Sequence, residues 1–156
     1  MPDIAPTELY IVFADFTGYN TEVARLADLD VAAVMGDWYV LSGAAIHAAG
    51  GRVVKFIGDA LLAVFPPDQI DHATQGLIAL RQAADRFMTS RGWSCRLHIR
   101  DHVGHVAAGH FGQGTDRRFD VLGHAVNTTA RLKSGPFVLS PEALARLSPE
   151  TREQVS

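Results

Sequence analysis

The sequence predicts an α/β fold of the α+β type, with a ferredoxin-like βαββαβ core in which helices pack on a mainly antiparallel sheet. Three observations lead to this prediction. Short apolar runs typical of buried strands alternate with segments whose apolar residues recur at helical spacing. The runs 52–57 and 60–65 are separated only by Gly-Asp, which predicts a β-hairpin. The length of 156 residues, 47% of them hydrophobic, suits one packed domain, which we expect over residues 1–156.

Each element follows from a local pattern, in the order β-α-α-β-β-α-β-β-α-β-α. Apolar runs or loose alternation predict strands, and apolar side chains three and four residues apart predict helices. The expected strands are 9–14, 52–57, 60–65, 96–111, 118–122 and 137–139. The expected helices are 20–29, 30–49, 71–90 and 126–133, then one that begins at Ser140-Pro141. Serine followed by proline marks a helix start, and Ser148-Pro149 repeats that signal.

The charge balance and the cysteine content exclude several classes of protein. The 14 basic and 17 acidic residues give a net charge of −3, so we expect no nucleic-acid partner bound through a strong basic field. The single cysteine, Cys95, allows no internal disulfide and no cysteine-based metal site. The N-terminus lacks signal-peptide features, and no apolar run approaches the roughly 18–20 residues that span a bilayer. We therefore expect a cytoplasmic protein with no membrane partner.

Two aspartates occupy positions that suit a metal site. Asp15 ends a buried strand, and Asp59 lies in the hairpin turn of a segment with no other acid. Carboxylates at the ends of adjacent strands can converge at one edge of a sheet, where they suit Mg²⁺, a hard cation that prefers oxygen ligands. The alternative is structural, with Asp15 capping the next helix and Asp59 forming the turn.

A second pair, Asn127 and Arg131, lies four residues apart on an expected helix, so both side chains project from one face. An amide donor beside a guanidinium suits a developing anionic phosphate. A helix-start asparagine and a solvated arginine are the alternative. The spacing of His98, His102 and His105 does not favour zinc, because on a strand the first two face one side and the third faces the other.

Three segments are informative together. Residues 13–20 are FADFTGYN, residues 51–60 are GRVVKFIGDA, and residues 119–132 are FDVLGHAVNTTARL. In this order they resemble the F-x-D-hydrophobic-x-G-F-[TS], G-G-x-hydrophobic-x-K-x-x-G-D and Y-D-x-x-G-x-x-V-N-x-A-x-R-hydrophobic motifs of class III nucleotidyl cyclase catalytic domains. The resemblance extends from about residue 9 to residue 147.

The resemblance implies an adenylate cyclase that converts ATP to 3′,5′-cyclic AMP and pyrophosphate, with two Mg²⁺ or Mn²⁺ ions per site assisting attack of the ribose 3′-hydroxyl on the α-phosphate. It also implies roles for residues at matching positions. The implied metal-binding residues are Asp15, Phe16 and Asp59. The implied nucleotide-contacting residues are Phe16, Thr17, Gly18 and Tyr19, the purine-selecting pair is Lys55 and Asp120, and the transition-state pair is Asn127 and Arg131.

The choice of base follows from donors and acceptors. Adenine presents N1 as an acceptor and its 6-amino group as a donor, whereas guanine reverses both. A lysine ammonium only donates and a carboxylate only accepts, so Lys55 with Asp120 complements adenine. Lysine is also scarce, since 12 of the 14 basic residues are arginine and only Lys55 and Lys133 are lysine.

The resemblance further implies a homodimer with shared active sites. Each site of such an enzyme takes its metal aspartates from one subunit and its base-selecting and transition-state residues from the other, so Lys55 and Asp59 of one hairpin serve different sites. The stretch 111–118 corresponds to the arm that reaches the partner.

The sequence departs from the family pattern in three places. Tyr19-Asn20 replaces the usual Phe-[Thr/Ser], and the loop after Arg131 is short. We expect the terminal hairpin, which usually carries a phosphate-binding lysine, to be absent, with Arg117 or Arg118 as a candidate substitute. The alternative function is a catalytically weak or inactive cyclase-like module that binds nucleotide and regulates a partner. Such modules usually lose a metal aspartate, and here both are present.

Overall fold

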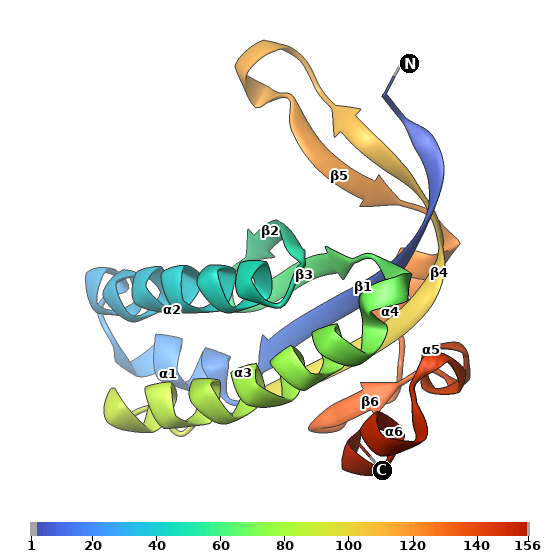
Figure 1. Ribbon diagram of the computed structural model, residues 1–156. Helices are drawn as coiled ribbons and strands as arrows, with labels where there is room; N and C mark the ends of the chain where they lie inside the picture. The colour runs from blue at the N-terminus through green and yellow to red at the C-terminus, as the bar shows by residue number, and fades with distance from the viewer. Residues whose placement is uncertain (1–2, 156) are drawn as a thin grey trace.

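The computed structural model describes residues 3–155 and has a sheet at its centre (Figure 1). The strands are β1 (Ala5–Phe16), β2 (Arg52–Ile57), β3 (Ala60–Phe65), β4 (Leu97–Phe111), β5 (Arg118–Leu122) and β6 (Phe137–Leu139). The helices are α1 (Tyr19–Arg25), α2 (Asp28–Ala48), α3 (Ile70–Ser90), α4 (His124–Ala130), α5 (Pro141–Arg146) and α6 (Pro149–Val155). Short 3₁₀ helices lie at Pro67–Gln69 and Gly114–Asp116.

The strand order in the sheet is β2-β3-β1-β4-β5, and β6 pairs with β4. All neighbours are antiparallel except β4 and β6, which are parallel. The strands β1 to β4 together with α2 and α3 form the βαββαβ core that the sequence predicts. The predicted fold class is therefore confirmed, and each predicted element is present within a few residues of its expected bounds.

The largest difference concerns β1, which begins at Ala5 rather than at Leu9. The whole of β1 pairs with β4, whereas its contact with β3 covers only Tyr10 to Ala14. The first part of the strand therefore has a neighbour on one side only. Because polar residues are tolerated there, no continuous apolar run marks that part of the strand in the sequence.

Alternate residues of β1 point to opposite faces of the sheet. Tyr10, Val12 and Ala14 contribute to the main core, which lies beneath α2 and α3. Ile11 lies on the other face, in a smaller cluster with residues of β3, β4, β5 and α4. Asp15 shares the parity of Ile11, so the strand places it on the face that α2 and α3 leave uncovered.

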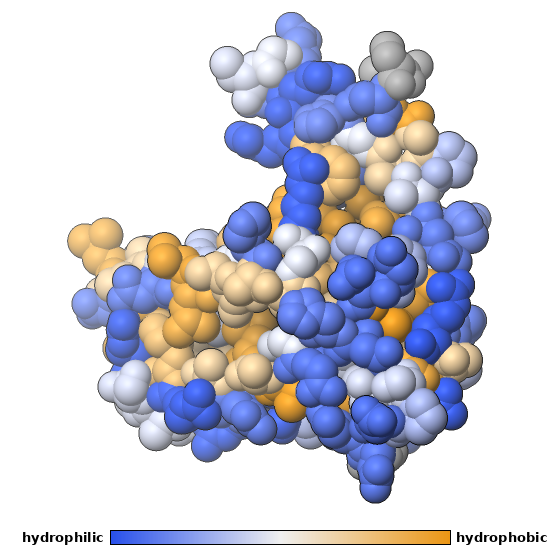
Figure 2. Space-filling view, viewed as in Figure 1, coloured by the Kyte–Doolittle hydropathy of each residue, from blue (hydrophilic) through white to orange (hydrophobic). Residues whose placement is uncertain are grey.

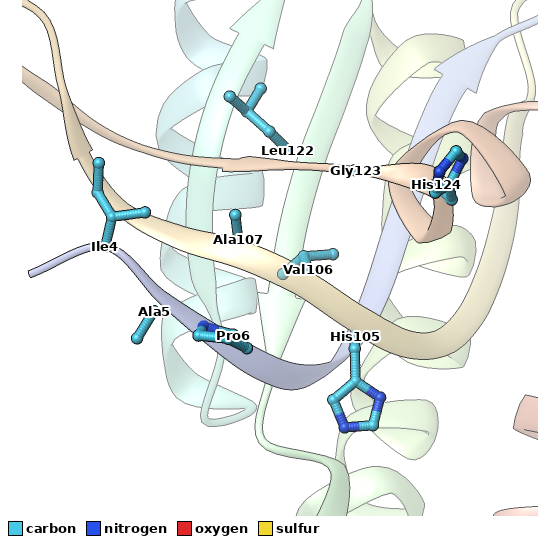
Figure 3. Close-up of a pocket in the computed structure, with 9 residues that line it drawn as sticks. All are labelled: Ile4, Ala5, Pro6, His105, Val106, Ala107, Leu122, Gly123 and His124. Atoms are coloured by element: carbon cyan, nitrogen blue, oxygen red, sulfur yellow. The ribbon is translucent and has the colours of Figure 1, made fainter. Parts of the chain in front are cut away.

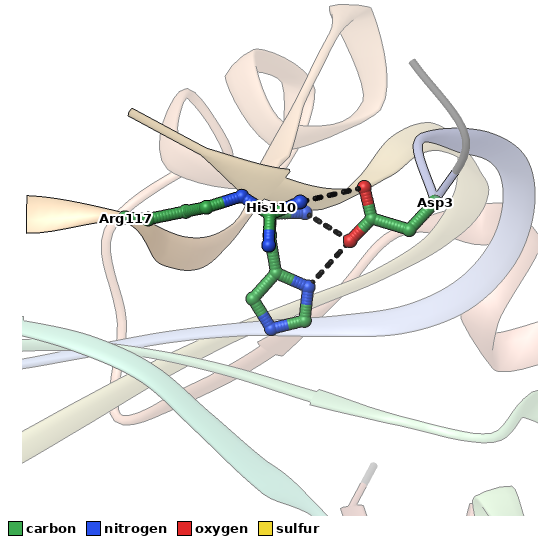
Figure 4. Close-up of polar contacts among 3 residues, drawn as sticks. All are labelled: Asp3, His110 and Arg117. Carbon is green, nitrogen blue, oxygen red and sulfur yellow. Dashed lines mark hydrogen bonds and ion pairs between the residues drawn. The ribbon is translucent and has the colours of Figure 1, made fainter. Parts of the chain in front are cut away.

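The N-terminal segment is held against the arm formed by β4 and β5, which projects beyond the body of the molecule (Figure 1). The chain passes close to Gly109, where an added Cβ would lie 2.7 Å from the Ile4 Cα. Asp3 Oδ2 accepts a hydrogen bond from the His110 amide and lies 2.6 Å from His110 Nδ1, while Arg117 pairs with Oδ1 (Figure 4). Arg117, one candidate for a phosphate contact, is thus engaged within the chain.

Within residues 3–155, one helix, α2, is long and apolar enough by length and composition to cross a membrane. The sequence analysis considered continuous apolar runs, and α2 forms none of that length because it contains aspartates. A single helix of this kind is weak evidence, since core helices pass the same test. Here Met35 and Trp38 are buried in the main core, while Leu29 and Val40 are exposed. Figure 2 shows hydrophobic residues on the side of the molecule where α2 lies.

A polar group lies inside the main core. The Tyr10 hydroxyl donates to Asp101 Oδ2 at 2.9 Å and also lies 2.9 Å from the Thr74 hydroxyl. Asp101 is fully buried, and within the described residues its Oδ1 has no hydrogen-bond partner. Burial raises the pKa of the Asp101 carboxyl well above its usual value, although the hydrogen bond from Tyr10 opposes the shift. The neutral acid is the form that this environment tolerates.

The substitution Asp101→Asn tests this assignment through the pH dependence of stability. A raised pKa means that the folded protein keeps a proton that the unfolded chain releases above about pH 4. The wild-type free energy of unfolding therefore falls as pH rises toward the folded-state pKa, by at most about 1.4 kcal/mol per pH unit. The variant lacks this loss, so its free energy of unfolding should rise relative to that of the wild type between pH 5 and 8. Urea unfolding measures both. Parallel pH profiles of the two proteins would contradict the assignment.

Candidate functional site

A polar cavity of about 430 Å³ lies at the carboxyl end of β1. Its lining residues come from β1, the start of α1 and the β2–β3 turn; they are Asp15, Phe16, Gly18, Tyr19, Asn20, Thr21 and Asp59. Gly18 and Gly58 have positive φ angles of 74° and 59°, which allow the chain to turn sharply on both sides of the cavity. The structure thus brings together the two predicted metal aspartates and three of the four predicted nucleotide-contacting residues.

The two aspartates differ in their surroundings. Asp59 Oδ2 accepts a hydrogen bond from the Phe16 amide at 3.0 Å, which joins the hairpin turn to the end of β1. Burial raises the pKa of Asp59, the Phe16 hydrogen bond opposes this, and the negative charge of Asp15 adds to the rise. A cation between the two carboxylates would relieve their repulsion.

The donor set of the cavity fits a divalent hard cation. Asp15 and Asp59 supply carboxylate oxygens, and no group of three or more His, Cys, Asp or Glu side chains that could hold a metal exists in residues 3–155. Mg²⁺ is usually held by one or two carboxylates and completes its octahedron with water and substrate phosphates. Asp15 and Asp59 could therefore hold a cation of this kind, and the described residues offer no set of side chains for a closed structural metal site.

The turn between β2 and β3 is supported from α2 by Tyr39. Its hydroxyl donates to the Gly58 carbonyl, and its ring stacks on Phe56 with 4.1 Å between centroids. Burial raises the pKa of the Tyr39 hydroxyl, and the negative charge of Asp59 adds to this. Sequence reasoning missed Tyr39, because its spacing marks only a helical position and gives no sign of contact with a turn 19 residues away.

Asp15 forms an ion pair that the sequence did not reveal. Arg100 Nη2 lies 3.2 Å from Asp15 Oδ2, and Arg100 Nη1 donates to the Ala130 carbonyl at 2.8 Å. The pairing of β1 with β4 places Arg100 opposite Phe13, diagonal to Asp15 on the same face. Only the register between the two strands identifies this contact.

The predicted base-selecting pair is formed within one chain. Lys55 Nζ lies 3.2 Å from Asp120 Oδ2, and the other carboxylate oxygen accepts from the Val121 amide at 2.8 Å. Beside them, the Arg52 guanidinium lies 3.7 Å from the centroid of the Phe119 ring. Because β2 and β5 stand at opposite ends of the strand order, the sheet must curve to bring these side chains together.

The predicted transition-state pair lies on α4 and at its end. Asn127 is in the helix, Arg131 follows its last residue, and both are exposed. Within residues 3–155, neither side chain makes a hydrogen bond or an ion pair. Among the described residues, Lys55, Asp120, Asn127 and Arg131 do not line the cavity of Asp15 and Asp59. One chain therefore presents the predicted site residues in separate groups.

A second hollow, of about 380 Å³, is mainly apolar and lies at the base of the arm (Figure 3). It is open to solvent and is bordered by Ile4 and the start of β1, by the middle of β4 and by the junction of β5 with α4. Ile4, Pro6, Val106 and Leu122 supply much of its apolar wall, and Leu122 is 49% exposed. This hollow shares no lining residue with the polar cavity.

Comparison with known proteins agrees with the motifs. A family model described as "Adenylate and Guanylate cyclase catalytic domain" matches residues 5–149. An adenylate cyclase from Anabaena cylindrica is 30% identical over 149 residues, which cover 87% of this chain and 30% of that protein. The chain thus spans less than a third of this relative.

Solved structures share the fold. A bacterial light-regulated adenylyl cyclase superposes with a TM-score of 0.84 at 23% identity, over 94% of this chain and 46% of that one. The guanylyl cyclase Cya2 also gives a TM-score of 0.84, at 19% identity, over 92% of this chain and 80% of that one. Because adenylyl and guanylyl cyclases superpose equally well, the fold does not distinguish ATP from GTP.

The substitution Asp59→Asn tests the polar cavity as a metal site. We expect it to weaken Mn²⁺ binding by about tenfold or more, because a neutral amide replaces one of two charged ligands. Binding is measured from the electron paramagnetic resonance signal of free Mn²⁺. Asp37→Asn is the matched control, since Asp37 lies on α2, pairs with Arg91 at the end of α3 and does not line the cavity. Equal affinities of the Asp59→Asn variant and the wild type would contradict the assignment.

Proposed function

The chain belongs to the family of adenylate and guanylate cyclase catalytic domains, and we propose that it is an adenylate cyclase. In this proposal it converts ATP to 3′,5′-cyclic AMP and pyrophosphate at two composite sites of a homodimer. The observation that carries the choice of ATP is the contact of Lys55 with Asp120, 3.2 Å apart within one chain.

This pair presents the pattern that adenine requires. The Lys55 ammonium has only donors and suits the N1 acceptor, while Asp120 Oδ2 has only acceptor capacity and suits the 6-amino group. Asp120 is held in orientation by the hydrogen bond from the Val121 amide to its other oxygen. Guanine would place a donor against Lys55 and an oxygen against Asp120, and mismatched polar groups of this kind discriminate strongly between substrates.

The chemical step forms a bond from the ribose O3′ to the α-phosphorus, with loss of the 3′-hydroxyl proton, and breaks the bond from that phosphorus to the oxygen that bridges it to the β-phosphate. The products are therefore 3′,5′-cyclic AMP, pyrophosphate and a proton. Asp15, Phe16 and Asp59 would hold Mg²⁺ or Mn²⁺, two ions per site, which neutralise the phosphates. Thr17, Gly18 and Tyr19 would contact the nucleotide. Asn127 and Arg131 donate to the developing charge on the α-phosphate.

The arrangement of these groups supports the homodimer. Within residues 3–155, the side chains of Asn127 and Arg131 make no hydrogen bond or ion pair, and they lie outside the cavity that holds Asp15 and Asp59. A second copy, related by two-fold symmetry, would supply the missing half of each site. The apolar hollow and the exposed Leu122 are the kind of surface that such a copy would cover.

One observation favours a second candidate, a catalytically weak or inactive module that binds nucleotide. The Arg100 guanidinium pairs with Asp15, where it competes with a metal ion for the carboxylate. Formation of cyclic AMP from ATP with Mg²⁺ or Mn²⁺ separates the two candidates. Nucleotide binding without product in either metal would establish the second.

A mixing experiment tests the shared sites. Asp59→Ala and Arg131→Ala proteins are each expected to be inactive, with a loss of about a thousandfold or more for the arginine. Combined in equal amounts, they should recover roughly a quarter of the wild-type activity, because half of the dimers are mixed and each has one intact site. No recovery, despite subunit exchange confirmed by mass spectrometry of the dimers, would contradict shared sites.

A double substitution tests the choice of base. Lys55→Glu with Asp120→Cys, the residues that guanylate cyclases of this family typically carry there, should shift the ratio of kcat/KM from ATP toward GTP. The change is made at both positions, because Lys55→Glu alone would place two carboxylates together. Lys133→Glu, which reverses the charge of the other, exposed lysine, is the control. Unchanged preference for ATP in the double variant would refute the role of the pair.

A further inference from the structure

Arg100 lies between two groups to which the proposed function gives different tasks. Its side chain is 20% exposed and therefore partly buried. Nη2 pairs with Asp15 Oδ2 at 3.2 Å, and Nη1 donates to the Ala130 carbonyl at 2.8 Å. The two acceptors come from the end of β1 and from the last residue of α4.

The Ala130 carbonyl belongs to the unsatisfied end of a helix. The last carbonyls of an α-helix have no partner within it, and a positively charged donor there is favourable. Ala130 immediately precedes Arg131, whose amide bonds back to the Asn127 carbonyl at 3.1 Å. Arg100 therefore anchors the turn of α4 from which the Asn127 and Arg131 side chains project.

We propose that Arg100 is a positioning residue that links occupancy of the metal site at Asp15 to the placement of Arg131. In the structure the guanidinium pairs with Asp15 and holds the end of α4 with the same planar fork. A cation at Asp15 and Asp59 takes the carboxylate from Arg100, because two positive charges cannot share that oxygen without repulsion. Arg100 then retains the Ala130 carbonyl as its acceptor.

This inference rests on the proposed function, and it adds a property to it. In the proposed homodimer, Asp15 of one chain serves one composite site and Arg131 of the same chain serves the other. Arg100 therefore connects a metal ligand of one site with the anchor of the transition-state residue of the second. The two sites would communicate through a single side chain, without any change in the sheet.

The first experiment measures Mn²⁺ binding to the wild type and to Arg100→Gln without nucleotide, by electron paramagnetic resonance. Removing the competing charge should tighten Mn²⁺ binding about two- to fivefold, the range that a partly exposed ion pair contributes. Arg146→Gln is the matched control, because it loses the same charge from an ion pair with Glu8 in another part of the fold. Arg100→Lys, which keeps the charge, should bind Mn²⁺ as the wild type does.

The outcomes separate this inference from the proposed function. A wild type that binds no Mn²⁺ would overturn the metal site and the link together. Wild-type binding that Asp59→Asn abolishes, with Arg100→Gln and Arg146→Gln both unchanged, would overturn the link alone. Should Arg100→Gln not fold, the wild type still provides the test: saturating Mg²⁺ should shift the Arg100 side-chain Nε–H resonance, and an unchanged resonance would overturn the proposal.

The second experiment separates the two contacts by using mixed dimers of Asp59→Ala and Arg131→Ala chains. Their one intact site takes its aspartates from the Arg131→Ala chain and Arg131 from the other. Arg100→Gln placed on the aspartate-supplying chain should lower the half-saturating metal concentration two- to fivefold and leave kcat nearly unchanged. Placed on the chain that supplies Arg131, it should lower kcat and leave the metal dependence unchanged. The same effect from both placements would show a merely structural role and overturn the proposal.

Discussion

The pairing of β1 with β3 on one side and β4 on the other is the constraint on which the rest of the structure depends. A strand that is hydrogen-bonded on both sides cannot rotate about its axis, so its alternate side chains point to fixed, opposite faces of the sheet. Tyr10, Val12 and Ala14 are committed to the core beneath α2 and α3. Asp15 is committed to the opposite face, where the hairpin turn brings Asp59 beside it.

Asp101 and Asp15 lie on neighbouring strands but on opposite faces of the sheet, and their surroundings differ accordingly. Asp101 lies on β4 and is fully enclosed with Tyr10 and Thr74, so burial favours its neutral form. Asp15 lies on the other face, where it is 42% exposed and paired with Arg100. The first is an enclosed carboxyl of the core, whereas the second faces the polar cavity.

Curvature of the sheet is the second determinant of the site. The edge strand β2 and the far strand β5 meet only because the sheet bends, and this bend produces the contact of Lys55 with Asp120. The same bend leaves an open apolar face at the base of the arm. The predicted site residues are therefore divided into separate groups along one chain, which is the division that the proposed two-fold assembly requires.

The sequence by itself determined the order and nature of the elements, because the periodicity of apolar side chains is a property of neighbouring residues. It also singled out Asp15, Asp59, Lys55, Asp120 and the pair on α4, since each lies in a motif readable over a few positions. Only the tertiary structure decided which of them touch. Lys55 and Asp120 are 65 residues apart, and Arg100 reaches Asp15 only in one register of β1 against β4. Register and curvature depend on many weak contacts across the whole sheet, so no short stretch of sequence specifies them.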